Sequence, residues 1–75
     1  MSQSSRPRKS PTQARSQATC DAIVRAAELV LGEHGADGLT TTRVAKKAGV
    51  SVGSLYQYFP NKGALVAALI ERYMQ

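Results

Sequence analysis

One stretch of the chain, residues 40–59, constrains the fold more than any other, because it combines two helix starts and one helix stop at short spacing. Thr40 has a hydroxyl that can accept a hydrogen bond from a backbone N–H one turn later, as the N-cap of a helix does. Gly49 follows the last apolar position, where a left-handed residue commonly ends a helix. Ser51 is the next residue able to cap. A second helix is therefore predicted about three residues after the first ends.

Apolar residues recur at helical spacing in both halves of this stretch. They are Val44, Ala45 and Ala48 in the first helix, and Val52, Leu55, Tyr56 and Phe59 in the second. Two helices joined by a turn of three or four residues that contains glycine form a helix-turn-helix, whose second helix lies in the major groove of DNA. The stretch is therefore interpreted as a DNA-reading motif.

A long helix is predicted ahead of the motif. The segment Ser10-Pro11-Thr12-Gln13 has the form of a capping box with proline at the first helical position, so a helix is expected from there to about Glu33. Its core-facing stripe consists of Ile23, Ala26, Ala27, Val30 and Leu31. Gly35 and Gly38 should end this helix and supply a loop, after which Leu39 should enter the core.

A fourth helix is predicted after Pro60, with Asn61 as its N-cap and its start near Lys62. Its apolar stripe consists of Leu65, Val66, Leu69, Ile70 and Tyr73. The predicted fold class is therefore all-α: a three-helix bundle with a helix-turn-helix formed by its second and third helices, plus the start of a fourth, linking helix. Residues 10–75 make up this domain, and the polar residues 1–9 are expected to be a disordered basic arm.

The formal net charge is +5, and its distribution indicates a polyanion as the partner. Residues 38–70 contain no acid but four basic residues, which are Arg43, Lys46, Lys47 and Lys62. An ordinary solvated lysine face is the alternative for these charges. The N-terminal arm could follow the phosphate backbone or enter the minor groove, or it could be a solubilising tail.

Other function classes find little support in the sequence. Seventy-five residues allow one small domain, without room for a large enzyme pocket. No paired carboxylates, metal-ligand spacing or phosphate-cradling glycine loop occurs, so neither catalysis nor a metal or other cofactor is expected. Cys20, the single cysteine, is interpreted as a small apolar filler, and His34 as a capping or packing residue. A protein-interaction module would need an apolar or acidic exposed face, against which Ser54 and Gln57 argue.

The pattern TTxRxxAxxAGVSxGxLYxYFxxKxxL closely resembles the N-terminal domain of the TetR (tetracycline repressor) family of transcriptional regulators. The resemblance covers about residues 17–73. It implies a homodimeric repressor whose N-terminal domains read the two half-sites of a palindromic operator in double-stranded DNA. It also implies a larger all-helical C-terminal domain, absent from this chain, that binds a small-molecule inducer and forms the dimer. Such a protein is expected to be cytoplasmic, nucleoid-associated and bacterial in type, with no membrane partner.

Chemistry and resemblance together select the candidate DNA-binding residues. They are Thr41, Thr42, Ser51, Val52, Gly53, Ser54, Tyr56, Gln57, Tyr58 and Lys62. Short hydroxyls and N–H groups at the start of the first motif helix suit a phosphate. In the second helix, Val52 offers an apolar contact, Gly53 a close backbone approach, and Ser54 a small polar group.

The resemblance also implies individual roles for some of these residues. It places the Tyr56 hydroxyl and the Lys62 ammonium on phosphates. Thr42 matches a family position that often carries arginine for a base contact, so threonine there weakens such a role. Tyr58 stays open between packing and DNA contact.

Overall fold

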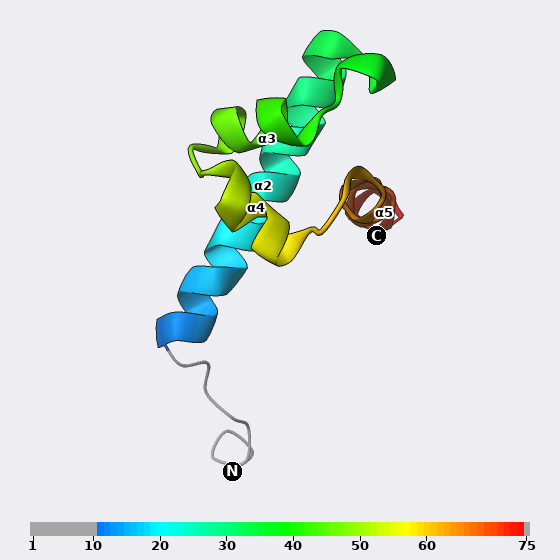
Figure 1. The fold of residues 1–75 in the computed structure, drawn as a ribbon. Helices are drawn as coiled ribbons and strands as arrows, with labels where there is room; N and C mark the ends of the chain where they lie inside the picture. The colour runs from blue at the N-terminus through cyan, green and yellow to red at the C-terminus, as the bar shows by residue number, and fades with distance from the viewer. Residues whose placement is uncertain (1–10, 75) are drawn as a thin grey trace.

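The structure is a computed structural model that describes residues 11–74 and the side chains of residues 14–74. The predicted N-cap at Ser10 and the arm of residues 1–9 lie outside the described residues. Helices are the only regular elements of the described part, and short turns join them (Figure 1). Its elements are α2 (Pro11–His34), the 3-10 turn η1 (Ala36–Gly38), α3 (Thr41–Ala48), α4 (Val52–Tyr58) and α5 (Lys62–Tyr73). The all-α prediction is confirmed.

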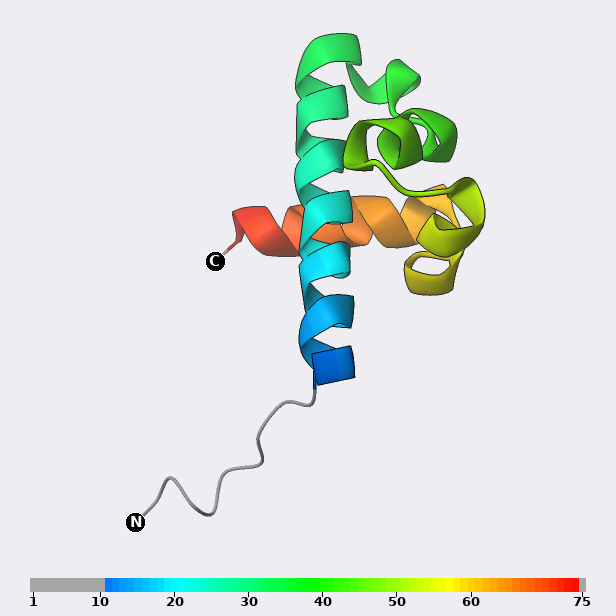
Figure 2. The same cartoon turned by 90° about the vertical axis from the view of Figure 1, so that its left-hand side faces the viewer.

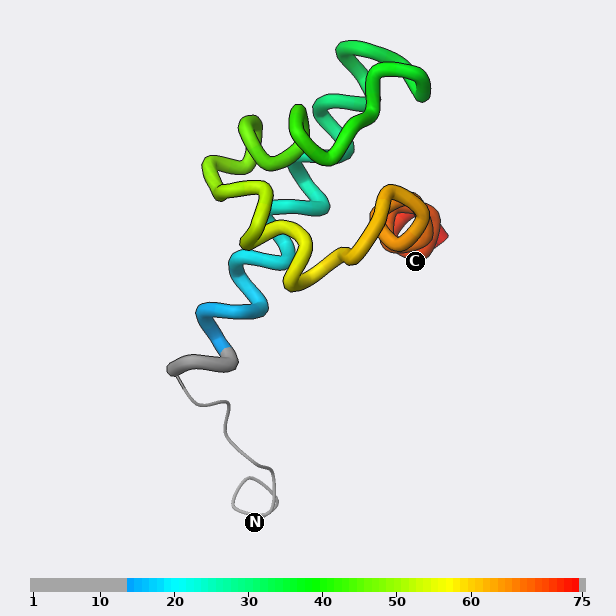
Figure 3. The backbone as a smooth tube through the Cα atoms, viewed as in Figure 1, coloured from blue at the N-terminus to red at the C-terminus, as the bar shows by residue number. Residues whose placement is uncertain are grey.

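The long helix α2 is the element on which the others pack, with contacts to α3, α5 and η1. Figure 2 shows α3 and α4 on one side of α2, while α5 crosses α2. The tube in Figure 3 shows the short turn that joins α3 to α4. This is the helix-turn-helix arrangement that residues 40–59 predicted.

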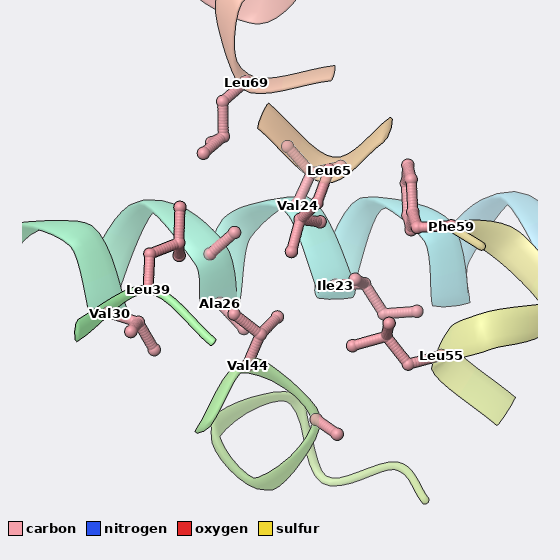
Figure 4. Packing of buried hydrophobic residues seen from close by; sticks show 12 residues of the cluster. Ile23, Val24, Ala26, Val30, Leu39, Val44, Leu55, Phe59, Leu65 and Leu69 are labelled. Atoms are coloured by element: carbon pink, nitrogen blue, oxygen red, sulfur yellow. The ribbon is translucent and has the colours of Figure 1, made fainter. Parts of the chain in front are cut away.

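One hydrophobic cluster holds the four helices together, and Figure 4 shows its side chains converging from all of them. Its members are Ile23, Val24, Ala26, Ala27, Val30, Leu39, Val44, Ala45, Leu55, Phe59, Leu65 and Leu69. The predicted plug at Leu39 is buried, and so is the predicted stripe of α2 except for Leu31, which is half-buried and packs against the cluster. Val24 is the one member of this cluster that the sequence did not predict. It is buried because α2 packs against α5 as well as α3, so that a wider face of α2 is covered.

Side-chain and glycine caps fix where the short helices begin and end. The Thr40 hydroxyl accepts a hydrogen bond from the Arg43 N–H at 3.1 Å, and the Asn61 side chain accepts one from the Ala64 N–H at 2.8 Å. Gly49 ends α3 with φ of 78°, in the left-handed region that favours glycine. These three predicted boundaries are confirmed.

The connection between α2 and α3 is tighter than the predicted loop, because residues 36–38 form one turn of 3-10 helix. Gly38 is buried there, and its carbonyl accepts a hydrogen bond from the Arg43 guanidinium at 3.1 Å. A Cβ built on Gly38 would lie 2.3 Å from the Cβ of His34. Residue 38 must therefore be glycine for the chain to pass this close to the end of α2.

Helix α5 packs less of its surface than its apolar stripe predicted. Leu65 and Leu69 are buried, but Ile70 is 56% and Tyr73 is 68% exposed. Ile70 and Tyr73 belong to the predicted apolar stripe, but they lie on an edge of it that the packing of α5 against α2 leaves uncovered. That edge lines an apolar groove of about 230 Å³, bordered also by Leu31, Leu39 and Val66.

An ion pair also connects the C-terminal end of α5 to α2. The Arg72 Nε lies 3.2 Å from a carboxylate oxygen of Glu28, and Arg25 contacts the other oxygen at 3.5 Å. The Glu28 side chain is only 15% exposed, so this carboxylate depends on its two cationic neighbours for compensation. The crossing of α5 over α2 thus rests on an ionic contact as well as on Leu65 and Leu69.

Two glycine substitutions should have opposite effects on stability. Gly38→Ala should lower the free energy of unfolding by about 1–3 kcal/mol, because the new methyl group meets His34 Cβ, which is fixed to the α2 backbone. Gly32→Ala should instead raise it by up to about 1 kcal/mol, because Gly32 lies inside α2 with nothing within 4 Å of a new Cβ. Urea unfolding followed by circular dichroism measures both. Equal stability of the Gly38→Ala variant and the parent chain would contradict the close approach.

Candidate nucleic-acid interface

Helix α4 is held in one rotational position by its buried side. Leu55 is fully buried and Phe59, at the C-terminal end of the helix, is 7% exposed. The turn before α4 is fixed by the Val50 N–H, which donates to the Ala45 carbonyl at 3.0 Å. Because Leu55 and Phe59 anchor the inner side, the residues on the opposite side must face outward.

The outward side of α4 consists of predicted site residues. Val52 is 36% and Tyr56 is 43% exposed, and Gly53 and Gln57 are also exposed. At about 100° per residue these four positions share one side of the helix. The structure therefore brings together four of the candidates as one exposed surface, which we call the α4 outer face: Val52, Gly53, Tyr56 and Gln57.

Ser51 and Ser54 form a local cap at the start of α4. The Ser51 hydroxyl accepts a hydrogen bond from the Ser54 N–H at 3.0 Å and donates to the Ser54 hydroxyl at 3.0 Å. Ser54 is half-buried, and its own hydroxyl proton stays available to an outside acceptor. Both serines thus cap the start of α4, and Ser54 remains partly accessible to solvent.

Thr41 and Tyr56 meet across the helix-turn-helix. Their hydroxyl oxygens lie 2.9 Å apart, although the residues are 15 positions apart in the chain and belong to α3 and α4. Sequence reasoning selected both residues but did not predict that they touch. Periodicity within each helix gives no signal for this contact, because Thr41 is at the start of α3, far along the chain from the turn that leads to α4.

Thr42 and Tyr58 are predicted site residues that do not belong to the α4 outer face. Thr42 is exposed in the first turn of α3. Tyr58 is half-buried and packs against the core cluster. Its ring therefore has a packing role, whichever groups its hydroxyl contacts.

The Lys62 side chain does not lie with the candidate DNA-binding residues of α4, but against the α2–α3 connection. Its ammonium donates to the Ala36 carbonyl of η1 at 3.3 Å, and its side chain lines the apolar groove of α5. Among the described residues this is its hydrogen-bond partner. Lys62 is exposed, so its charge is in solvent, but it is not part of the hydroxyl cluster of Thr41 and Tyr56.

The other basic residues of the motif gather in a different place. Arg43, Lys46 and Lys47 line an open hollow of about 480 Å³ between α3 and the end of α2, together with Glu33 and His34. Lys47 contacts the Glu33 carboxylate at 3.1 Å, which neutralises part of the predicted positive face. Lys46 is exposed and has no ionic partner among residues 14–74. It was not selected from the sequence, although its spacing of one turn after Thr42 places it on the same side of α3.

The remaining groups that could bind a metal ion or react as a thiol lie outside this surface. No group of three His, Cys, Asp or Glu residues is close enough to hold a metal ion there. Burial raises the pKa of the Cys20 thiol, and the neighbouring Asp21 carboxylate raises it further, so at neutral pH Cys20 is protonated and packs as an apolar group. Among residues 11–74, no helix has the length and apolar character needed to cross a membrane.

Comparison with known proteins places the chain among bacterial regulators. The model of a family described as bacterial regulatory proteins, tetR family, matches residues 23–69. The nucleoid occlusion factor SlmA of Haemophilus ducreyi is 51% identical over 47 residues, which cover 63% of this chain and 23% of that protein. The tetracycline repressor protein class A from transposon 1721 of Escherichia coli is 49% identical over 49 residues, covering 65% of this chain and 23% of the repressor. The chain thus matches about a quarter of the length of these relatives.

Proposed function

The chain belongs to the tetR family of bacterial regulatory proteins, which are DNA-binding transcriptional regulators, and we propose that its helix-turn-helix reads one half-site of an operator in double-stranded DNA. The observation that carries the proposal is the α4 outer face. Its residues are exposed on a helix whose opposite side is locked into the core by Leu55 and Phe59. A helix presented in this way can enter a major groove without rearrangement of the domain.

Base recognition in this proposal depends on small and neutral groups. The Gln57 amide can form two hydrogen bonds with adenine, and the Val52 side chain can contact a thymine methyl group. Gly53 has no side chain, so the α4 backbone can lie close to the base edges. The outer face has no arginine or lysine for a bidentate contact with guanine. Discrimination between operator sequences should therefore also depend on DNA shape and on the pairing of two DNA-binding domains.

Affinity in this proposal comes mainly from phosphate contacts. The Tyr56 hydroxyl, which lies within hydrogen-bond distance of the Thr41 hydroxyl, supplies a donor on the outer face, and Lys46 supplies a cation without an ionic partner among residues 14–74. Lys62 can leave the Ala36 carbonyl for a phosphate at little cost, because that hydrogen bond is exposed and 3.3 Å long. Lys47 contributes least, because Glu33 already compensates its charge.

We further propose that the regulator acts as a homodimer on a palindromic operator and is released by a small-molecule inducer. When two DNA-binding domains are held at a fixed spacing, the binding of one raises the effective concentration of the other at its half-site. One isolated domain should therefore bind weakly. The larger C-terminal domain implied by the family resemblance would carry the inducer site and the dimer contacts. The exposed groove beside Ile70 and Tyr73 is an apolar surface against which such a domain could pack. In this proposal the protein acts in the bacterial cytoplasm, on the nucleoid.

The salt dependence of binding tests the DNA proposal. The logarithm of affinity should fall linearly with the logarithm of salt concentration, with a slope of about −0.9 for each phosphate neutralised. Lys62→Met should flatten this slope by about 0.9 and weaken all sequences alike. Lys47→Met is the matched control and should leave the slope nearly unchanged, because its ammonium is paired with Glu33. Affinity that does not respond to salt would overturn the proposal.

Selection of bound duplexes from random DNA tests the base readers. Gln57→Ala should relax the preference at one position of each half-site and cost about 1–3 kcal/mol there. Ser54→Ala should change the selected sequence less, because Ser54 is half-buried and belongs to the helix cap. An unchanged preference in the Gln57→Ala variant would remove Gln57 from the set of base-reading residues.

A further inference from the structure

We propose that Thr41 is a positioning residue that acts on DNA through Tyr56, so that the two hydroxyls form one hydrogen-bonded relay ending on a phosphate. The inference rests on the proposed function and names how one phosphate contact is built. Its basis is the 2.9 Å distance between the Thr41 and Tyr56 hydroxyl oxygens. In the described part of the chain, this is the only side-chain hydrogen bond that joins α3 to α4.

The number of protons decides what the pair can do. Each hydroxyl has one proton and can both donate and accept. When one hydroxyl donates to the other, one proton is left for an outside acceptor. The pair therefore presents a single oriented donor, and the hydrogen bond within it strengthens the donor at the outer end.

Exposure decides which hydroxyl stands at the outer end. Tyr56 is 43% exposed on the α4 outer face, whereas Thr41 is half-buried at the start of α3. A phenol is also the stronger acid of the two alcohols and so the better donor to an anionic phosphate oxygen. Thr41 then donates to the Tyr56 oxygen, and Tyr56 donates to the phosphate.

The relay also fixes the Tyr56 ring before DNA arrives. An exposed tyrosine otherwise samples several side-chain conformations, and ordering one such side chain on binding costs roughly three- to tenfold in affinity. The hydrogen bond to Thr41 removes much of that cost. Because the bond joins α3 to α4, it also couples the phosphate contact to the angle between the two helices of the motif.

A double-mutant cycle with Thr41→Val and Tyr56→Phe tests whether Thr41 acts on the phosphate through Tyr56. Binding is measured by fluorescence anisotropy, at one salt concentration, on the duplex recovered by selection. Tyr56→Phe should weaken binding roughly ten- to 100-fold, as expected for a hydrogen bond to a charged group. Thr41→Val should weaken it roughly three- to tenfold in the parent chain. In the Tyr56→Phe background, Thr41→Val should have no further effect.

Four controls separate positioning from a structural role. Thr41→Ser keeps the hydroxyl and should bind like the parent chain. Thr42→Val changes an exposed neighbour on the same helix and should have the same effect in both backgrounds. The salt slope should be the same for all variants, because neutral hydroxyls release no counterions. Thermal unfolding of each variant checks that the domain is folded.

Two results would overturn the inference while leaving DNA binding intact. Additive effects of Thr41→Val and Tyr56→Phe would mean that Thr41 contacts DNA independently. Loss of the Tyr56→Phe effect in the Thr41→Val background would mean that Thr41, not Tyr56, is the outer donor. If the folded parent chain binds no duplex at all, the proposed function fails and the relay fails with it.

Discussion

The fold depends on the burial of one side of α2. Ile23, Ala27 and Val30 are almost completely buried there, and each of the shorter helices places its own apolar residues against that side. Helices α3 and α4 have 8 and 7 residues, well below the roughly 12–15 residues at which an isolated helix becomes even marginally stable in water. They exist because α2 offers a surface on which they can bury Val44 and Leu55.

The same packing sets the geometry of the candidate interface. Once Leu55 and Phe59 are buried, the rotation of α4 is fixed and its outer face is decided. The short turn after Gly49 and the cap at Ser51 then determine where α4 begins relative to α3. As a result, the hydroxyls of Thr41 and Tyr56 meet at 2.9 Å without any further element to guide them. Core packing and surface chemistry are therefore parts of one arrangement.

The basic side chains of the motif do not simply form one free positive face. A count of basic residues in the motif predicted one positive face, but the folded domain uses several of these side chains internally. Arg43 and Lys62 donate to backbone carbonyls of the α2–α3 connection, and Lys47 is paired with Glu33. The carbonyl contacts leave the charges of Arg43 and Lys62 uncompensated, whereas the carboxylate contact does not. The neutral hydroxyl and amide groups beside α4 consequently carry more of the proposed recognition than the sequence indicated.

Local signals in the sequence were sufficient for the helices, because caps, glycine stops and apolar periodicity act within a few residues. Thr40, Gly49, Ser51 and Asn61 mark boundaries that the structure confirms. The family pattern, likewise, depends on residues that are close in the chain. The structure shows where the predicted DNA-contacting residues lie: four of them share the α4 outer face.

Long-range contacts could not be predicted in the same way, because they depend on how the helices cross. The exposure of Ile70 and Tyr73 shows that one edge of the α5 stripe is uncovered among the described residues, and periodicity cannot reveal a missing neighbour. The clash that excludes a side chain at Gly38, the pairing of Glu28 with Arg72, and the contact of Thr41 with Tyr56 each join separate elements. Local residue patterns were thus enough to identify the helices and the family, whereas the polar groups that meet depend on the tertiary fold, because only packing sets distances between residues far apart in the chain.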